Sequence, residues 1–146
     1  MTVSELYEKL HSPQFQDTET DMFYNFYIFQ YPATDEYEIR RQIQVFKENL
    51  KRPASYVDTL TLDLFEEFCR FLDLQNFGKQ NPSLLRFLMQ MEAKTPDNIQ
   101  KVLSQQANSQ KFYEYIYERI QQHISIKDEM HRPYVFVYGI GDMFPY

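Results

Sequence analysis

The spacing of hydrophobic residues changes along the chain between the period of a helix and that of a strand. At the start, Leu6 and Leu10 lie four residues apart after Ser4, a suitable N-cap, which predicts a short helix over residues 4–11. Residues 23–31, FYNFYIFQY, are rich in aromatic and β-branched side chains and stop before a proline. Such a run is typical of a strand that is buried on both faces, and we expect the first strand here.

A helix and a second strand are predicted next. Thr34 or Asp35 can cap a helix whose apolar positions recur every three to four residues, namely Tyr37, Ile39, Ile43, Phe46 and Leu50. Beyond this helix, residues 55–65 alternate hydrophobic and polar positions in the two-residue period of a strand. Strand, helix and strand in this order form a βαβ unit, which predicts a parallel sheet.

The middle of the chain is predicted to be helical. Directly after the second strand, Asp63 can cap a helix with one apolar stripe, formed by Leu64, Phe65, Phe68, Phe71 and Leu72. Ser83 introduces another helix over residues 84–94, and a third helical region is expected over residues 95–123. The polar stretch SQQANSQ at residues 104–110 leaves open whether this third region is one helix or two.

Residues 132–141, RPYVFVYGIG, form the third predicted strand and carry two of the three glycines of the chain at its end. Three strands separated by helices predict an α/β fold, a three-layer sandwich in which helices flank a mostly parallel sheet. Residues 1–22 would form an N-terminal helix or arm, and residues 23–146 the α/β domain. Because a following helix normally covers the last parallel strand, we expect this domain to be incomplete at its C-terminus; the alternative is a natural end with that strand at the sheet's centre.

Composition and charge narrow the class of protein. A chain of 146 residues with 43% hydrophobic and 25% charged residues suits one folded domain. The net charge of −6 argues against nonspecific nucleic-acid binding, which requires an excess of Lys and Arg to contact phosphates. A single cysteine, Cys69, excludes an internal disulfide, and no apolar run is long enough to span a membrane. We therefore expect a cytoplasmic protein without a membrane partner.

The turn after the last predicted strand is the best candidate for a binding site. No P-loop, hydrolase, zinc-protease or paired-cysteine motif occurs, and the three histidines lie far apart, so we expect no catalytic residues, no metal site and no cofactor. At the turn, Gly139, Gly141 and Asp142 are the candidate binding residues, because ligands of parallel sheets sit at the carboxyl ends of the strands. A structural turn is the favoured interpretation, since the third glycine of a dinucleotide fingerprint is missing.

Two acidic residues follow neighbouring predicted strands. Asp63 and Asp142 would lie at the same edge of a parallel sheet if the second and third strands are adjacent. Paired carboxylates can bind Mg²⁺, but Asp63 also suits the N-cap of the helix that follows it.

Three passages resemble the BrxB family of bacteriophage-exclusion (BREX) systems. They are residues 23–50, residues 56–72 and, above all, YVFVYGIGDMFPY at residues 134–146. In that family a strand is followed by a Gly-x-Gly and an aromatic-Pro-aromatic turn, matched here by Gly139, Gly141, Phe144, Pro145 and Tyr146. The resemblance spans about residues 22–146, although the helical region at residues 75–125 matches only in character, and it depends on the order and spacing of the passages. Members of the family continue past this point into a further helix and strand.

The resemblance implies a cytoplasmic, non-catalytic subunit of a phage-defence complex. Its expected role is assembly, needed for host DNA methylation and phage restriction beside a methyltransferase, an ATPase and PglZ, an alkaline-phosphatase-like protein. The expected partners are other BREX proteins, PglZ first among them, and self-association stays open. The alternative is a nucleotide-binding or hydrolytic α/β domain that uses the turn at Gly139 and Gly141.

Overall fold

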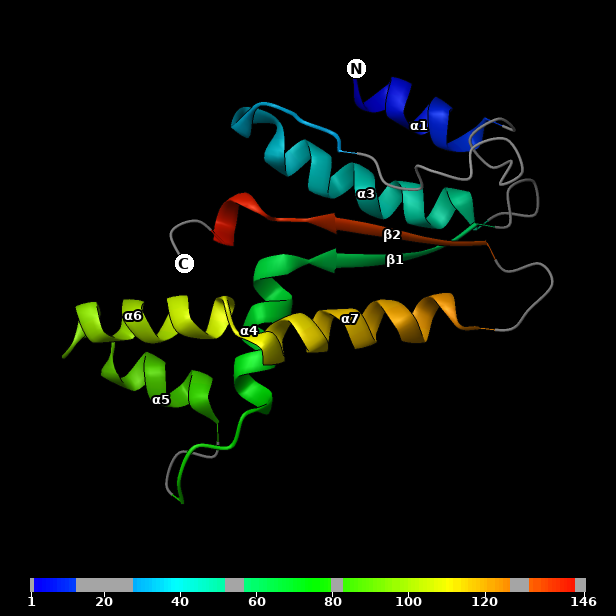
Figure 1. Ribbon diagram of the computed structural model, residues 1–146. Helices are drawn as coiled ribbons and strands as arrows, with labels where there is room; N and C mark the ends of the chain where they lie inside the picture. Colours follow the sequence, from blue (N-terminus) through cyan, green and yellow to red (C-terminus); the bar gives the residue numbers. More distant parts are fainter. Residues whose placement is uncertain (1, 13–27, 52–56, 80–82, 127–131, 144–146) are drawn as a thin grey trace. The chain divides into compact units, whose positions relative to one another are not determined.

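The computed structural model describes the chain in five stretches: residues 2–12, 28–51, 57–79, 83–126 and 132–143. Over these residues the fold is mixed α/β and 67% helical, with a parallel sheet of two strands, β1 (Val57–Asp63) and β2 (Arg132–Tyr138), flanked by helices (Figure 1). The chain divides into two compact units, Met1–Thr59 with Asp128–Tyr134, and Leu60–Lys127 with Val135–Tyr146. We call them the first and the second unit.

In the first unit, α1 (Val3–His11) packs against α3 (Glu36–Leu50), which follows the 3₁₀ turn η1 (Ala33–Asp35). The short helix predicted at the start is confirmed, but its N-cap is Thr2 instead of Ser4. The Thr2 hydroxyl accepts a hydrogen bond from the Glu5 amide, and the Glu5 carboxylate accepts one from the Thr2 amide at 2.6 Å. This reciprocal capping box satisfies two amide groups that the helix itself leaves without partners.

The buried face of α3 agrees with the predicted stripe except at one position. Ile39, Ile43, Phe46 and Leu50 are all buried. Tyr37, also assigned to the stripe, is 88% exposed. It lies two residues before Ile39, which puts it on nearly the opposite side of the helix.

The first predicted strand is wrong where the structure describes it. Ile28, Phe29, Gln30 and Tyr31 belong to no strand, and residues 23–27 lie outside the described residues. A strand needs a neighbour for its backbone, whereas Tyr31 is held by a local contact, its hydroxyl donating to the Glu36 carboxylate at 2.7 Å. The predicted three-layer sandwich with three strands is therefore confirmed only in its coarser form, an α/β fold with a parallel sheet.

The second unit contains four helices among its described residues. They are α4 (Leu64–Leu74), α5 (Leu84–Met91), α6 (Pro96–Ala107) and α7 (Gln110–Ile124). Their buried faces meet in one core, formed by Phe68, Phe71, Leu72, Leu84, Leu88, Ile99 and Phe112. Phe112 of α7 lies at the aromatic centre of this core, with its ring centroid 5.2 Å from that of Phe68 and 5.2 Å from that of Phe71.

The caps of these helices follow from the sequence. Asp63 accepts hydrogen bonds from the amides of Phe65 and Glu66, as predicted for the start of α4. The predicted region 95–123 is two helices, because Ser109 caps a new helix by accepting from the Phe112 amide at 3.2 Å. Helix α5 ends at Met91 instead of Lys94, and the amides of Lys94 and Thr95 both donate to the Met91 carbonyl in the turn that follows.

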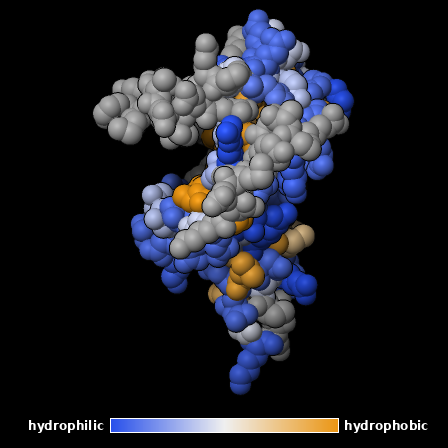
Figure 2. Space-filling model, turned by 90° about the vertical axis from the view of Figure 1, so that its right-hand side faces the viewer, coloured by the Kyte–Doolittle hydropathy of each residue, from blue (hydrophilic) through white to orange (hydrophobic). Residues whose placement is uncertain are grey.

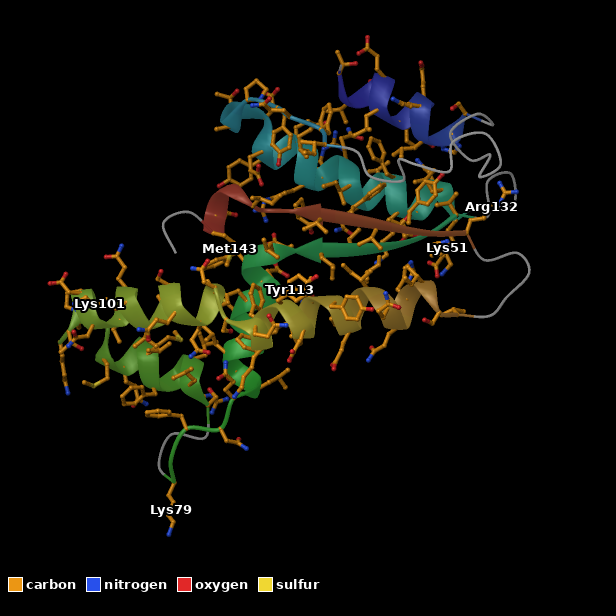
Figure 3. The ribbon with its side chains drawn as sticks, viewed as in Figure 1. Lys51, Lys79, Lys101, Tyr113, Arg132 and Met143 are labelled. Carbon is orange, nitrogen blue, oxygen red and sulfur yellow. The ribbon has the colours of Figure 1, made fainter. Side chains whose placement is uncertain are left out.

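The loop between α4 and α5 turns at Gly78, whose φ of 71° is costly for any other residue type except Asn or Asp. The neighbouring Lys79 points away from the helices (Figure 3).

Within the part of the chain that the structure describes, no helix is long and apolar enough to cross a bilayer. The division into an arm at residues 1–22 and a domain at 23–146 stays a prediction.

We predict that Phe112→Ala destabilises the protein by about 3–5 kcal/mol, because it leaves a cavity between two buried aromatic rings. The matched control is Tyr113→Ala on the same helix, which removes a side chain that is 66% exposed and should change stability by about 0.5 kcal/mol or less. Urea unfolding of the three proteins measures both effects. Equal losses in the two variants would contradict the assignment of Phe112 to the core.

Candidate functional site

The turn after β2 is shaped by Gly139, which is buried and has a φ of 70°. Its carbonyl accepts a hydrogen bond from the Asp142 amide at 3.2 Å, and the carbonyl of Ile140 accepts one from the Met143 amide at 3.1 Å. These bonds close the 3₁₀ turn η2 (Gly141–Met143), which contacts α4. Gly139 is thus required by the backbone of the turn, since a side chain is disfavoured at this φ. Gly141 has open space where a Cβ atom would stand.

The two acidic residues at the ends of the strands differ in their surroundings. Strands β1 and β2 are adjacent, as the pairing of Asp63 with Asp142 requires. Asp63 is 5% exposed and caps α4, so its carboxylate already bonds the first free amides of that helix. Asp142 is exposed in η2. Among the described residues, no group of three or more His, Cys, Asp or Glu could hold a metal ion.

The structure contains a buried ionic network that the sequence did not reveal. Glu67 of α4 is 1% exposed, yet its carboxylate is fully engaged. One oxygen accepts from Arg70 at 2.7 Å and from Arg119 of α7 at 3.1 Å, and the other accepts from the Tyr115 hydroxyl at 2.7 Å. A carboxylate this deeply buried needs such partners, because an unpaired charge is strongly disfavoured there. The network therefore joins α4 to α7.

This network also changes the acid–base behaviour of Tyr115. Burial raises the pKa of its hydroxyl, and the hydrogen bond to Glu67 and the negative charge of Glu67 raise it further. The phenol is thus kept in its neutral, donating form. The side chains of Arg70 and Arg119 are 58% and 38% exposed, so the network reaches solvent through these two residues.

An apolar groove lies between α4, α5 and α6 in the second unit, and we call it the α4–α6 groove. It has a volume of about 170 Å³. It is lined by Phe65, Phe68, Cys69, Leu72, Leu85, Leu88, Met89, Glu92, Ile99 and Leu103. Phe68, Leu72, Leu88 and Ile99 belong to the buried core, whereas Met89 is 67% exposed. Core side chains therefore form the floor of this groove, and partly exposed ones its walls.

Cys69 lines the α4–α6 groove. Burial raises the pKa of its thiol, and the negative charges of Glu66 and Asp63 raise it further. Because the thiolate is the nucleophile, a raised pKa makes a cysteine less reactive at neutral pH. The groove therefore offers apolar contacts to a ligand, with negative charge at its rim.

Large hydrophobic side chains are exposed elsewhere on the second unit. Leu74 is the last residue of α4, Phe77 follows three residues later, and Tyr113 and Tyr117 lie one turn apart on α7. Tyr113 lies near the start of that helix (Figure 3). The face of the protein in Figure 2 is largely hydrophilic, with separate hydrophobic patches. Hydrophobic side chains that are scattered over a surface in this way are common and mark no site by themselves.

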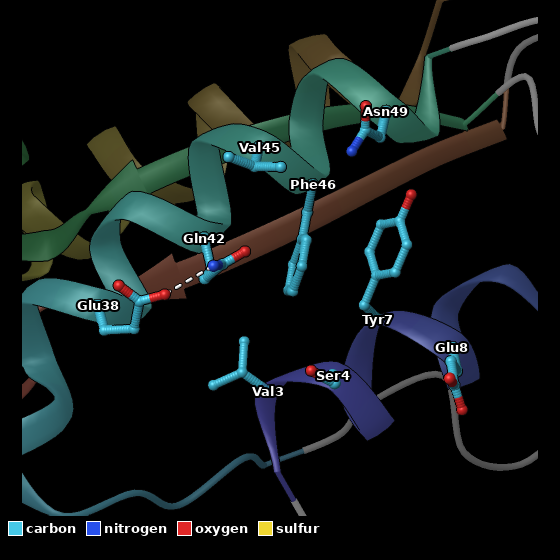
Figure 4. Close-up of a pocket in the computed structure, with 9 residues that line it drawn as sticks. All are labelled: Val3, Ser4, Tyr7, Glu8, Glu38, Gln42, Val45, Phe46 and Asn49. Carbon is cyan, nitrogen blue, oxygen red and sulfur yellow. Dashed lines mark hydrogen bonds between the residues drawn. The ribbon is translucent and has the colours of Figure 1, made fainter.

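A second hollow, of about 260 Å³, lies between α1 and α3 in the first unit (Figure 4). The rings of Tyr7 and Phe46 stack within it, with centroids 4.8 Å apart. At its rim, the hydrogen bonds from Arg41 and then from Gln42 lower the pKa of Glu38 to about 2. Arg41 already neutralises this carboxylate, so Glu38 offers little to a charged ligand. The hollow mixes polar and apolar walls and is the weaker candidate of the two.

Comparisons of the chain with models of protein families, with curated proteins and with solved structures returned no match. The resemblance to BrxB accordingly stays a prediction. The structure brings Gly139, Gly141 and Asp142 together in one turn beside α4, and binding by these residues stays a prediction as well.

We predict that Tyr115→Phe lowers stability by about 1–3 kcal/mol at pH 8, because it leaves a buried oxygen of Glu67 without its donor. The loss should shrink in alkaline solution. A raised pKa means that the contribution of the hydroxyl is complete below about pH 10, the ordinary pKa of Tyr, and declines as the pH rises through the pKa of the folded protein. Urea unfolding between pH 8 and pH 11 measures this, with the exposed Tyr113→Phe as control. A loss that does not change with pH would refute the role of the bond.

We expect ATP, GTP and Mg²⁺ to leave the melting temperature unchanged, because Asp63 occupies the amides at the start of α4 that would otherwise meet a phosphate. A thermal-shift titration tests this. A rise in melting temperature that Asp142→Ala abolishes would support the alternative, a nucleotide site at the glycine turn.

Proposed function

We propose that the chain is a protein-interaction subunit and that it binds its partner through the α4–α6 groove. The observation that carries this proposal is an apolar groove with exposed side chains at its walls, among them Phe65 and Met89. Exposed apolar surface costs free energy in water, and a partner that covers it removes that cost. Methionine suits such a surface because its unbranched side chain adapts to different partners.

The rigidity of the groove supports the same function. Its floor consists of core residues, so the groove keeps its shape without a partner and little order has to be gained on binding. Its wall on α4 is fixed from the other side by the contacts of Phe71 and Glu67 with α7. A preformed apolar groove of this kind is typical of protein recognition.

We further propose that the partner belongs to a BREX-type phage-defence complex, with PglZ as the first candidate. The support is the resemblance of residues 22–146 to the BrxB family, whose members serve assembly in host DNA methylation and phage restriction. Cytoplasmic localisation and the finer fold, a three-layer sandwich with a third strand, form part of the same proposal.

The alternative function is nucleotide binding at the glycine turn. Its support is the left-handed conformation of Gly139 at the carboxyl end of a parallel strand, where ligands of such sheets bind. The capping of α4 by Asp63 is evidence against it, because the amides at the start of that helix are already bonded and cannot receive a phosphate.

Co-expression with the other proteins of a BREX operon, followed by affinity purification of the chain, tests the proposal. We expect one of these proteins, PglZ first, to co-purify with the unchanged chain and to be lost with Met89→Asp, which places a charge at the wall of the groove. The matched control is Leu74→Asp, because Leu74 is 71% exposed and lies outside the groove. Retention of the partner by Met89→Asp, or no co-purifying partner at all, would refute the proposal.

A further inference from the structure

The α4–α6 groove has room for one large apolar side chain. Its volume of about 170 Å³ is well below the roughly 300–1,000 Å³ of pockets that hold drug-sized ligands. The groove therefore has the size for one anchor residue of a partner and is too small for a drug-sized molecule. The surrounding walls are helices, and an amphipathic helix commonly lays its apolar face on a groove of this kind.

One acidic side chain lines this groove, and two more stand beside it on α4. Glu92 lines it directly. Glu66 and Asp73 stand three residues before and four residues after Cys69, so they share the adjoining face of α4. All three acidic residues are exposed. The rim therefore presents negative charge next to the apolar floor.

The basic residues beside this rim are fewer than the acidic ones: Arg86 stands three residues before Met89 on α5, and Arg70 of α4 pairs with Glu66 and Glu67. Among the described residues, no lysine or arginine lines the groove. No ion pair in that part of the chain involves Glu92 or Asp73, whereas Glu66 contacts Arg70 at 3.4 Å. The negative charge also reaches into the groove, because Glu66 and Asp63 raise the pKa of the Cys69 thiol in addition to the effect of its burial. An overall charge of −6 adds to the same field.

Resting on the proposed interaction function, we infer that the α4–α6 groove binds a basic amphipathic helix of a partner protein. One large apolar side chain of that helix fills the hollow, and Lys or Arg residues beside it pair with Glu92 and with the acidic residues of α4. The apolar anchor supplies most of the affinity, whereas the charges speed association and select the partner.

A pair of fluorescent peptides tests this inference. Each is about 18 residues long, with leucines on one helical face; one carries lysines on the other face and its counterpart glutamates. We expect the lysine peptide to bind the full chain in an anisotropy titration and the glutamate peptide to bind at least about tenfold more weakly. Equal affinities would contradict the inference.

The native cysteine shows whether the peptide occupies the groove. Because Cys69 is the only cysteine of the chain and lines the groove, bound lysine peptide should slow its alkylation by iodoacetamide several-fold. Binding without protection of Cys69 would mean that the peptide is attracted by net charge alone, and it would overturn the inference.

Variants separate the anchor from the charges. Met89→Asp should weaken the lysine peptide by about tenfold, because it replaces apolar contact at the wall of the groove with a hydrated carboxylate, and Glu92→Gln should weaken it a few-fold and reduce its salt dependence. Leu74→Asp, matched to Met89→Asp in exposure and charge change, should leave binding unchanged. Equal weakening by Leu74→Asp would refute the groove as the site. The melting temperature of each variant confirms that it is folded.

The inference and the proposed function can fail separately. If the lysine peptide does not bind but Met89→Asp still loses a co-purified partner, the groove is an interface and its partner is not a basic helix. If the chain instead associates with itself and Met89→Asp abolishes this in sedimentation experiments, a second copy occupies the groove and the inference is wrong. If neither a peptide nor a partner depends on Met89, both fail.

Discussion

The second unit depends on the contact between α4 and α7. It combines two kinds of interaction: the aromatic packing of Phe68 and Phe71 around Phe112, and the buried carboxylate of Glu67 held by Tyr115 and Arg119. The aromatic contact supplies the buried apolar area that stabilises the unit. The ionic network fixes how the two helices are placed against each other, because Glu67 can be buried only where all of its donors reach it.

This contact fixes one face of α4 against α7 and leaves the opposite face of α4 to line the groove. Glu67 and Phe71 face α7, while Phe65, Cys69 and Leu72 line the α4–α6 groove. The same helix begins at the Asp63 cap, directly after β1. The end of β1, the cap of α4 and the residues of α4 that form the core and the groove thus follow one another along one segment of the chain. A change in the core of the second unit is expected to alter the groove as well.

Much of this fold can be predicted from the sequence because it is encoded locally. The alternation in residues 55–65 predicts β1, the run at 132–141 predicts β2, and Asp63 predicts the start of α4. The strand predicted to include residues 28–31 does not form, because aromatic content alone does not define a strand. The backbone of a strand also needs a neighbouring strand for its hydrogen bonds. The buried Tyr115–Glu67–Arg119 network depends on which helices meet, which local patterns do not reveal.

A signal for Glu67 nevertheless exists in the sequence. Glu67 lies three residues after Leu64 and four before Phe71, so it interrupts the apolar stripe of α4, and a charge at such a position requires a partner. The groove forms only where three helices meet, so it cannot be predicted from any one of them, and no motif indicates it.

The proposed function depends on the role of the α4–α6 groove as an interface. A photo-crosslinking amino acid in place of Met89 tests it most directly in cells that contain the partner. We expect a crosslink from position 89 and none from position 74; crosslinks from position 74 alone would contradict the role of the groove.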